Sequence, residues 1–453
     1  MKNPALLRNA LTLLLAGMLL SCGGGGGGGS GGAAVATSNV GTAAVAGTGT
    51  SASVNSDSAG GAATGASTSA STSTAADGST ATASSGDGSG VGSGGTGIST
   101  GDASTSVGSV SGLGSIIVDS VRYNIDSASV DLHDAAALDI GMTVSVRGPI
   151  NASAATGVAQ QVSSSVELRG PASAINSSAG SFVMMGTVVT IDEATVMADL
   201  SGLADLPSGS VIQVWGLPAG PGLLRATRIQ RQVFDTSSVV TGTIERLDAG
   251  AGTFSLGGVS VAYGAAAFGS GLNANALANG AIVRARSPGP VVSGVFNATQ
   301  IELWYPVPVA TGTAIQLEGV ITNYASLGSF NLLGSSVDAS MAQVTGGQAS
   351  KVGNGVTVEV AGTLSNGVLV ASKVKIKHLP GGGALPSFTL IGPVGNYVSP
   401  ASFRVHGQQV DASGASVVFV NGMPAMLSNG TPVTILGSQI VNGALIASQV
   451  TFN

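Results

Sequence analysis

Apolar and polar residues alternate in a short phrase that occurs five times along the chain. The phrase is Gly-x-x-hydrophobic-x-hydrophobic-x-Gly, and this alternation is typical of a half-buried β-strand. Its five occurrences are GMTVSVRG from Gly141, GSVIQVWG from Gly209, GAIVRARS from Gly280, GVTVEVAG from Gly355 and GTPVTILG from Gly430. Successive copies begin roughly 70 residues apart, which predicts a tandem array of similar units.

A second apolar segment follows each phrase within a few residues. It begins with Gly and ends with Val or Ile, as in GVAQQV (157–162), GLLRATRI (222–229), GVFNATQI (294–301), GVLVASKV (367–374) and GALIASQV (443–450). In the last two copies an Asn-Gly pair, at Asn366 and Asn442, stands between the two apolar runs. Asn-Gly at this place is a strong signal for a β-hairpin.

The fourth copy shows the expected strand order most clearly. Strands are predicted over 316–324, over 329–333, from 336–338, over 356–363 and over 368–377, with a loop and a possible helical turn over 339–354. Five strands in about 65 residues, with an irregular crossover between the third and fourth, suit a small closed barrel of the OB type. An SH3-like barrel and a small sandwich are the alternatives. In the third copy Ser287 replaces the closing Gly and Ala285 replaces a β-branched residue, so we expect an irregular barrel there.

The period divides the folded part into five β repeats. Repeat 1 is 107–166, repeat 2 is 167–235, repeat 3 is 236–306, repeat 4 is 307–380 and repeat 5 is 381–453. A unit of this size buries little core by itself, so contacts between neighbouring repeats are expected. The expected fold class is all-β.

The N-terminus resembles a lipoprotein signal. Lys2 and Arg8 precede an apolar stretch over 10–20, which is too short to span a membrane, and Leu19-Leu20-Ser21-Cys22 then matches a lipobox. We therefore expect a signal peptide over 1–21 and lipidation of Cys22, the only cysteine. Gly at position 23 favours the outer membrane, with the membrane face left open.

A low-complexity segment follows the lipobox. Residues 23–106 are almost wholly Gly, Ser, Ala, Thr and Val, with four Asp and no Lys or Arg. Such a composition cannot bury enough apolar surface to offset its ordering entropy. We expect 22–106 to be a disordered tether that begins at the lipidated cysteine.

Three segments together resemble a bacterial family described as domain of unknown function 5666. They are GSVSGLGSIIVDSVRYNID (108–126), LRGPASAI (168–175) and GSVIQVWG…LLRATRI (209–229). The resemblance covers about residues 107–453. It implies tandem copies of a small domain in a secreted or lipid-anchored protein, and it implies no activity.

Charge argues against a nucleic-acid partner. The chain has 16 Lys and Arg against 22 Asp and Glu, and binding to phosphate backbones needs clustered cations. Two sets of basic residues alternate along strands and are interpreted as solvated strand faces or edge protection. They are Arg225, Arg228 and Arg231, and Lys373, Lys375 and Lys377.

Few other side chains are candidates for chemistry. His133, His378 and His406 lie in different repeats, so we expect surface or turn positions and no metal site. Trp215 and Trp304 are expected to pack in the core or between repeats, with stacking on a sugar or base as the alternative.

One acidic position recurs at the end of the third strand. It is occupied by Asp126, Asp192, Asp338 and Asp411. Asp at such a place is expected to accept backbone N–H bonds in a turn, with a repeated cation or sugar contact as the alternative.

No signature of a nucleophile, cofactor or phosphate-binding loop accompanies these residues. The glycines flank strands without a following Gly-Lys-Ser/Thr, and no Gly-x-Ser-x-Gly elbow has a suitable context. We therefore expect no catalytic, metal or cofactor residues. The preferred hypothesis is a non-enzymatic envelope lipoprotein whose barrels form a scaffold or binding array for a protein or polysaccharide. The alternative is an envelope polymer hydrolase that uses acidic residues at repeat junctions.

Overall fold

The computed structural model describes residues 103–453, apart from 152, 232–235, 270 and 383–384. All of these residues belong to one compact unit of the chain. The expected signal peptide, the lipidation of Cys22 and the tether up to residue 102 lie outside the described residues, and they stay predictions. The tether was expected to extend to residue 106, but residues 103–106 already belong to the first strand, β1 (Ala103–Leu113), so the folded part begins earlier than predicted. The described part is all-β. Its helical elements are four three-residue 3₁₀ turns: η1 (Leu203–Asp205), η2 (Ala274–Ala276), η3 (Ala349–Lys351) and η4 (Pro424–Met426).

Repeat 4 matches the predicted strands closely. Its strands are β21 (Ala314–Ser326), β22 (Ser329–Leu332), β23 (Ser335–Asp338), β24 (Gln343–Thr345), β25 (Thr357–Ser365) and β26 (Val368–His378). The expected helical turn is η3, whereas the short strand β24 was not predicted. A three-residue strand between turns carries too little alternation to be recognised from sequence.

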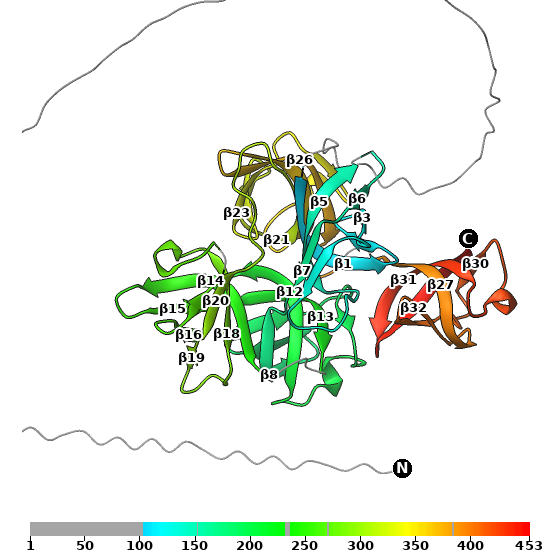
Figure 1. Cartoon of the computed structure of the whole chain (residues 1–453), viewed down its shortest axis with the longest axis horizontal. Helices are drawn as coiled ribbons and strands as arrows, with labels where there is room; N and C mark the ends of the chain where they lie inside the picture. The colour runs from blue at the N-terminus through cyan, green and yellow to red at the C-terminus, as the bar shows by residue number, and fades with distance from the viewer. Residues whose placement is uncertain (1–102, 152, 232–235, 270, 383–384) are drawn as a thin grey trace, which may run out of the picture. The chain divides into compact units, whose positions relative to one another are not determined.

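Hydrogen bonding between these strands closes on itself. β21 pairs antiparallel with β22, and β22 with β23; β23 pairs parallel with β26, which pairs antiparallel with β25, and β25 returns to β21. β24 adds a parallel pairing to the second half of β26. Closure of this kind leaves no long free edge and forms a barrel, seen at the top of Figure 1.

Repeats 2 and 5 have the same closed order of strand pairing. In repeat 2 the strands are β8 (Leu168–Asn176), β9 (Ser181–Met184), β10 (Thr187–Thr190), β11 (Val196–Met197), β12 (Val211–Gly220) and β13 (Leu223–Gln230). In repeat 5 they are β27 (Phe388–Ser399), β28 (Ser402–Val405), β29 (Gln408–Asp411), β30 (Val418–Val420), β31 (Pro432–Val441) and β32 (Ala444–Phe452).

Repeat 1 has the same order with its last strand in two pieces. Its strands are β1 (Ala103–Leu113), β2 (Ile116–Val118), β3 (Val121–Asn124), β4 (Ser129–Leu132), β5 (Thr143–Asn151), β6 (Thr156–Val158) and β7 (Gln161–Ser164). β3 pairs parallel with β6, and β6 pairs with β5, so the circuit still closes.

Repeat 3 is the irregular one, as its sequence predicts. Its strands are β14 (Ser238–Asp248), β15 (Thr253–Leu256), β16 (Val259–Ala262), β17 (Ala267–Phe268), β18 (Ile282–Ser287), β19 (Val295–Asn297) and β20 (Gln300–Leu303). β18 ends at Ser287, the residue that replaces the closing Gly. It pairs with β14 and β20, whereas β19 pairs with β16, and no described pairing joins β18 to β19.

Each repeat encloses an apolar interior. The second strand of repeats 2 to 5 carries a phenylalanine that is at most 2% exposed: Phe182, Phe254, Phe330 and Phe403. Full burial of one such side chain stabilises the fold by roughly 1.5–3 kcal/mol. The alternating apolar positions of the sequence therefore form the barrel interiors.

First strands also pair between repeats. β1 pairs in parallel with β21 at 105–107 and with β27 at 112–113, and β8 pairs antiparallel with β14. In Figure 1, β1 accordingly runs from the strands of repeat 4 to those of repeat 5. Contacts between repeats were expected, but mainly between neighbours along the chain. Repeat 1 also pairs with the distant repeats 4 and 5, because its long first strand offers an edge beyond β5 and β2.

Candidate functional site

A buried ion cluster joins repeats 1, 2 and 3. Asp134 accepts bonds from Arg169 and, in bidentate geometry at 2.8 and 2.9 Å, from Arg286. The side chain of Asp134 is 1% exposed and also accepts the Val166 N–H. Burial alone would raise the pKa of Asp134, but the two arginines and the N–H lower it to about 2. The carboxylate is therefore charged and fully partnered.

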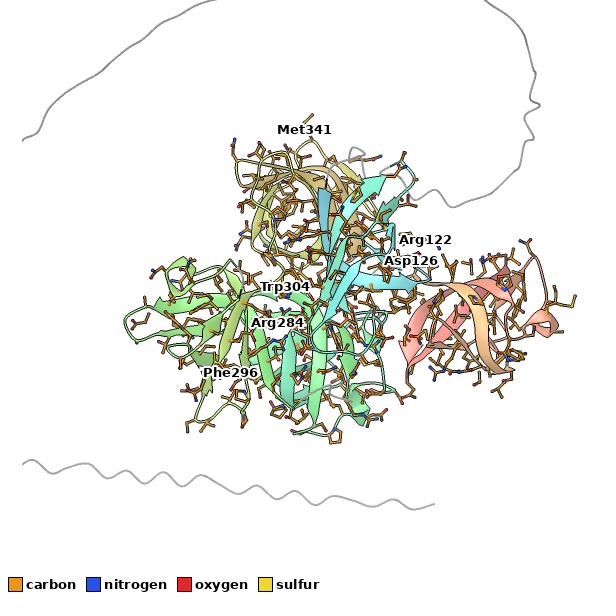
Figure 2. All side chains as sticks on the ribbon, in the orientation of Figure 1. Arg122, Asp126, Arg284, Phe296, Trp304 and Met341 are labelled. Carbon is orange, nitrogen blue, oxygen red and sulfur yellow. The ribbon has the colours of Figure 1, made fainter. Side chains whose placement is uncertain are left out.

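A second buried carboxyl group lies at the same junction. Glu167 accepts hydrogen bonds from Thr143 Oγ1 at 2.8 Å, Trp304 Nε1 at 3.0 Å and the Gly216 N–H at 2.7 Å. Arg284 Nη2 lies 3.7 Å from its Oε1, and Figure 2 shows Arg284 and Trp304 in this part of the molecule. Burial raises the pKa of Glu167 to about 7, although Arg284 and these donors act in the opposite direction.

The junction between repeats 1 and 4 is also polar. The turn between β2 and β3 places Asp119 and Ser120 against the outer face of the repeat 4 barrel. Ser120 Oγ donates to Glu359 at 2.9 Å and accepts from Lys375 Nζ at 2.8 Å. Asp119 is fully buried, and neither carboxyl oxygen has a hydrogen-bond partner among the described residues. Burial, with Glu359 and Glu318 nearby, raises the pKa of Asp119 well above its usual value.

The pKa of Glu318 of β21, at the same junction, is shifted in the opposite direction. Its Oε2 accepts from the N–H and Oγ of Ser109 at 2.8 and 2.7 Å, and Lys377 Nζ lies 3.4 Å from its Oε1. Burial would raise the pKa of Glu318, but Lys377 and Ser109 outweigh it and lower that pKa.

These junctions overturn the interpretation as solvated strand faces for Arg225, Arg228 and Lys373, whereas Arg231 is exposed. Arg225, Arg228 and Lys373 are 7–9% exposed, and Arg228 donates to the Ile140 carbonyl at 2.9 Å. Alternating positions on a last strand do point away from its own barrel, as predicted. That outer face is covered by another repeat, because the barrels pack laterally, and a single-repeat pattern cannot show this.

The two tryptophans pack between repeats, as expected. Trp215 of repeat 2 is completely buried beside Met142 and Val166 of repeat 1 and Val239 of repeat 3. Trp304 is 3% exposed. Stacking of either side chain on an outside sugar or base is therefore ruled out by burial.

The recurrent aspartates are largely turn residues. Asp192, Asp338 and Asp411 each accept the N–H two residues later at 2.9 Å, in Asx-turn geometry. Asp126 differs, because its own N–H donates to Asn124 Oδ1. The predicted turn role is confirmed at three of the four positions.

The histidines divide into two kinds. His133 is exposed beside Asp131, and His406 lies in a turn where its Nε2 is 2.8 Å from the Ile391 carbonyl oxygen. His378 was also expected at the surface, but its side chain is only 11% exposed and faces Asp192 and Glu193 of repeat 2. Folding thus brings together residues that are far apart in sequence.

An open cleft of about 1260 Å³ lies among repeats 2, 3 and 4. One wall comes from the tip of the β12–β13 hairpin, with Pro218 and Leu223. The other walls use equivalent positions of consecutive repeats: Arg246 of repeat 3 corresponds to Asn323 of repeat 4, and both have a φ of 50°. Further polar lining residues are Thr243, Glu245, Asn279, Thr322, Asn331 and Asn354.

Two of the cleft asparagines make a side-chain to backbone hydrogen bond that recurs in repeat 5. Asn279 Oδ1 accepts the Leu247 N–H at 3.0 Å, and Asn354 Oδ1 accepts the Tyr324 N–H at 2.8 Å. In repeat 5, Asn429 accepts the Tyr397 N–H at 2.8 Å in the same way. Each asparagine directly precedes the first Gly of the repeated phrase, so an Asn-Gly pair at this place in the sequence signals the hydrogen bond.

Within the described residues, the structure contains no helix with the length and hydrophobicity needed to cross a bilayer. A comparison with curated proteins finds no match.

A family model described as a domain of unknown function (DUF5666) matches residues 169–230, 318–375 and 392–451. These three regions lie in repeats 2, 4 and 5, whose last strands β13, β26 and β32 are continuous. The matches support tandem copies of this domain of unknown function in the chain.

Proposed function

We propose that the protein is a non-enzymatic scaffold whose tandem barrels bind a polymer in the cleft among repeats 2, 3 and 4. In repeat 4, β23 pairs parallel with β26 and β25 closes on β21, and this pairing supports an OB-type barrel. Barrels of this type often bind oligosaccharides or oligonucleotides. The observation that carries the proposal is the cleft itself, about 1260 Å³ in volume and located between domains, where ligand sites are common.

The chemistry of the cleft favours a polysaccharide over a protein. Glu245 and Arg246 are the charged members of its lining, and the other polar groups are asparagine amides, threonine hydroxyls and backbone. Amides and hydroxyls both donate and accept hydrogen bonds, which matches the hydroxyl groups of a sugar. Consecutive repeats contribute equivalent positions, so a chain of repeated sugar units is the ligand class that fits. A protein segment is the competing partner.

The test uses a matched pair of asparagines. Asn323 lines the cleft, whereas Asn396 of repeat 5 is its equivalent outside it; their φ values are 50° and 46°, and both side chains are exposed. Replacement by alanine imposes the same backbone strain at either site. Asn323→Ala should weaken binding of a neutral polysaccharide such as dextran or glucomannan at least fivefold, and Asn396→Ala should leave it unchanged.

Calorimetric titration of the full-length chain with these polysaccharides measures the difference. Equal binding by both variants, or no polysaccharide binding by the wild-type chain, would reject the cleft as a sugar site. Binding of an envelope protein that Asn323→Ala abolishes would assign the cleft to a protein partner instead.

One observation favours the alternative of an envelope polymer hydrolase. The repeat 1–4 junction brings Asp119, whose pKa is raised, near Glu318, whose pKa is lowered, and such a pair suits general acid and base roles. Asp119 is 0% exposed and Glu318 3% exposed, and the cavity beside Glu318 has a volume of about 80 Å³. That volume is well below the usual 300–1,000 Å³ of ligand pockets, so the binding function ranks first. If the wild-type chain hydrolyses an envelope polymer and Glu318→Gln does not, hydrolysis would rank above binding.

We also propose that a lipid on Cys22 anchors the protein at the cell envelope, and that Gly23 directs it to the outer membrane. Support comes from the lipobox, since stable anchoring by acyl chains needs more than one chain and lipoprotein processing supplies several. Cys22→Ser should move the protein from the membrane fraction to the soluble fraction and abolish labelling by palmitate. Unchanged fractionation would reject the anchor.

A further inference from the structure

Three potential metal ligands converge where repeats 2 and 4 meet. Asp192 and Glu193 follow β10, and His378 is the last residue of β26. One ligand atom from each lies within 4.8 Å of the other two. The side chains of Asp192 and His378 are 10% and 11% exposed, whereas Glu193 is 50% exposed and leaves the group open to solvent.

The spacing of these atoms suits a metal ion better than direct hydrogen bonds. His378 Nε2 lies 3.5 Å from Asp192 Oδ2, and His378 Nδ1 lies 3.8 Å from Glu193 Oε2. Both separations exceed the 2.7–3.2 Å of ordinary N–H···O hydrogen bonds. A single ion binds only one imidazole nitrogen, so the Nε2 separation is the one that corresponds to a pair of ligands. Two ligands at 2.0–2.1 Å from a tetrahedral zinc ion are roughly 3.4 Å apart, so the observed 3.5 Å separation is close to that of a ligand pair.

The neighbours of Asp192 hold its carboxylate in place. Its Oδ1 accepts the Ala194 N–H at 2.9 Å, and its Oδ2 accepts from Arg225 Nε at 2.5 Å. Metal-binding carboxylates commonly have such supporting hydrogen bonds. The Arg225 charge also repels a cation, so we expect weaker binding than at a structural zinc site with four protein ligands.

We propose that Asp192, Glu193 and His378 bind one divalent transition-metal ion of the zinc class and thereby link repeats 2 and 4. One imidazole nitrogen and two carboxylate oxygens form a set that zinc accepts, with water completing the coordination. Magnesium and calcium prefer sets made of oxygen atoms alone, so they should not compete. This site lies apart from the lining residues of the polymer cleft and does not depend on the proposed function.

Titration of the full-length chain with Zn²⁺ should show one site, and excess Mg²⁺ should not displace the ion. Glu193→Gln is the principal variant, because a half-exposed side chain can be replaced without disturbing the fold, and it should weaken Zn²⁺ binding at least tenfold. His378→Gln should have the same effect. Arg225→Gln should strengthen binding, because it removes the nearby positive charge.

His133→Gln is the matched control. His133 is exposed and lies 2.9 Å from Asp131, so it offers a single His–Asp pair without the third ligand. The His133→Gln variant should bind Zn²⁺ as the wild-type chain does. Zn²⁺ should raise the melting temperature of the variant and of the wild-type chain. The proposal is overturned if the wild-type chain binds no Zn²⁺, or if Glu193→Gln and His378→Gln bind it with wild-type affinity.

Discussion

The interiors of the barrels and the junctions between them are built from different chemistry. Inside repeat 4, Phe330 is 2% exposed among apolar neighbours. At the junction of repeats 1, 2 and 3, Asp134, Glu167 and Arg169 are at most 1% exposed and depend on ionic or hydrogen-bonded partners. Apolar packing tolerates many arrangements, whereas buried charges need specific partners. We infer that the interiors stabilise each barrel and that the junctions define how the barrels meet.

Removal of the central junction charge should have the largest effect. Asp134→Asn leaves the buried Arg169 and the partly exposed Arg286 without their shared counter-charge. It should lower the free energy of unfolding by roughly 5 kcal/mol, the upper end for a broken buried pair. Urea unfolding of the full-length chain measures the loss. A loss below 1 kcal/mol would show that the junction does not depend on this ion cluster.

Truncation in a barrel interior should come next. Phe330→Ala creates a cavity inside repeat 4 and should lower the free energy of unfolding by roughly 4 kcal/mol. Limited proteolysis with mass spectrometry locates the damage. We expect new cleavage within repeat 4 for Phe330→Ala, and at the contacts among repeats 1, 2 and 3 for Asp134→Asn. Identical cleavage patterns would remove the distinction between interior and junction.

Glu167 should make the junction sensitive to pH. Its pKa is raised to about 7 in the folded protein, so its protonated form is favoured by folding. Its contribution is fully present below its unfolded pKa of about 4.5 and is lost as pH rises through 7, a change of roughly 3 kcal/mol. Glu167→Gln should flatten this decline, although its amide cannot accept from all three donors and lowers stability overall. An unchanged slope between pH 5 and 8 in the variant would contradict the assignment.

Replacement of Asp119 should change stability least, and it should stabilise the protein where the other substitutions destabilise it. Asp119→Asn removes a buried acidic group whose oxygens have no hydrogen-bond partner among the described residues, and asparagine tolerates the φ of 50° at this position. The free energy of unfolding at pH 7 should rise by about 1–2 kcal/mol. A destabilised variant, measured by urea unfolding at pH 7, would show that the carboxylate contributes to the junction with repeat 4.

The sequence predicted the barrels better than the contacts between them. Each strand pattern is local: the alternation at 356–363 and the Asn366-Gly367 turn are enough to place β25, β26 and the hairpin that joins them. Repeat 3, where Ser287 and Ala285 depart from the pattern, is also irregular in the structure. The junctions depend on which outer faces meet. Nothing near Lys377 in the chain indicates that Glu318 will be its partner, or that His378 will lie beside Asp192.

The parallel pairing of β1 with β21 has a consequence for the order of folding. Ser106 contacts Gln316 across 210 residues, and β27 lies further still along the chain. During synthesis the first strand is made early, yet two of its partners emerge only when most of the protein has left the ribosome. Contacts of such long range slow folding and prolong the exposure of an unpaired edge. Truncation at the C-terminus should therefore promote aggregation through the first strand, although the missing segment is far from it in sequence.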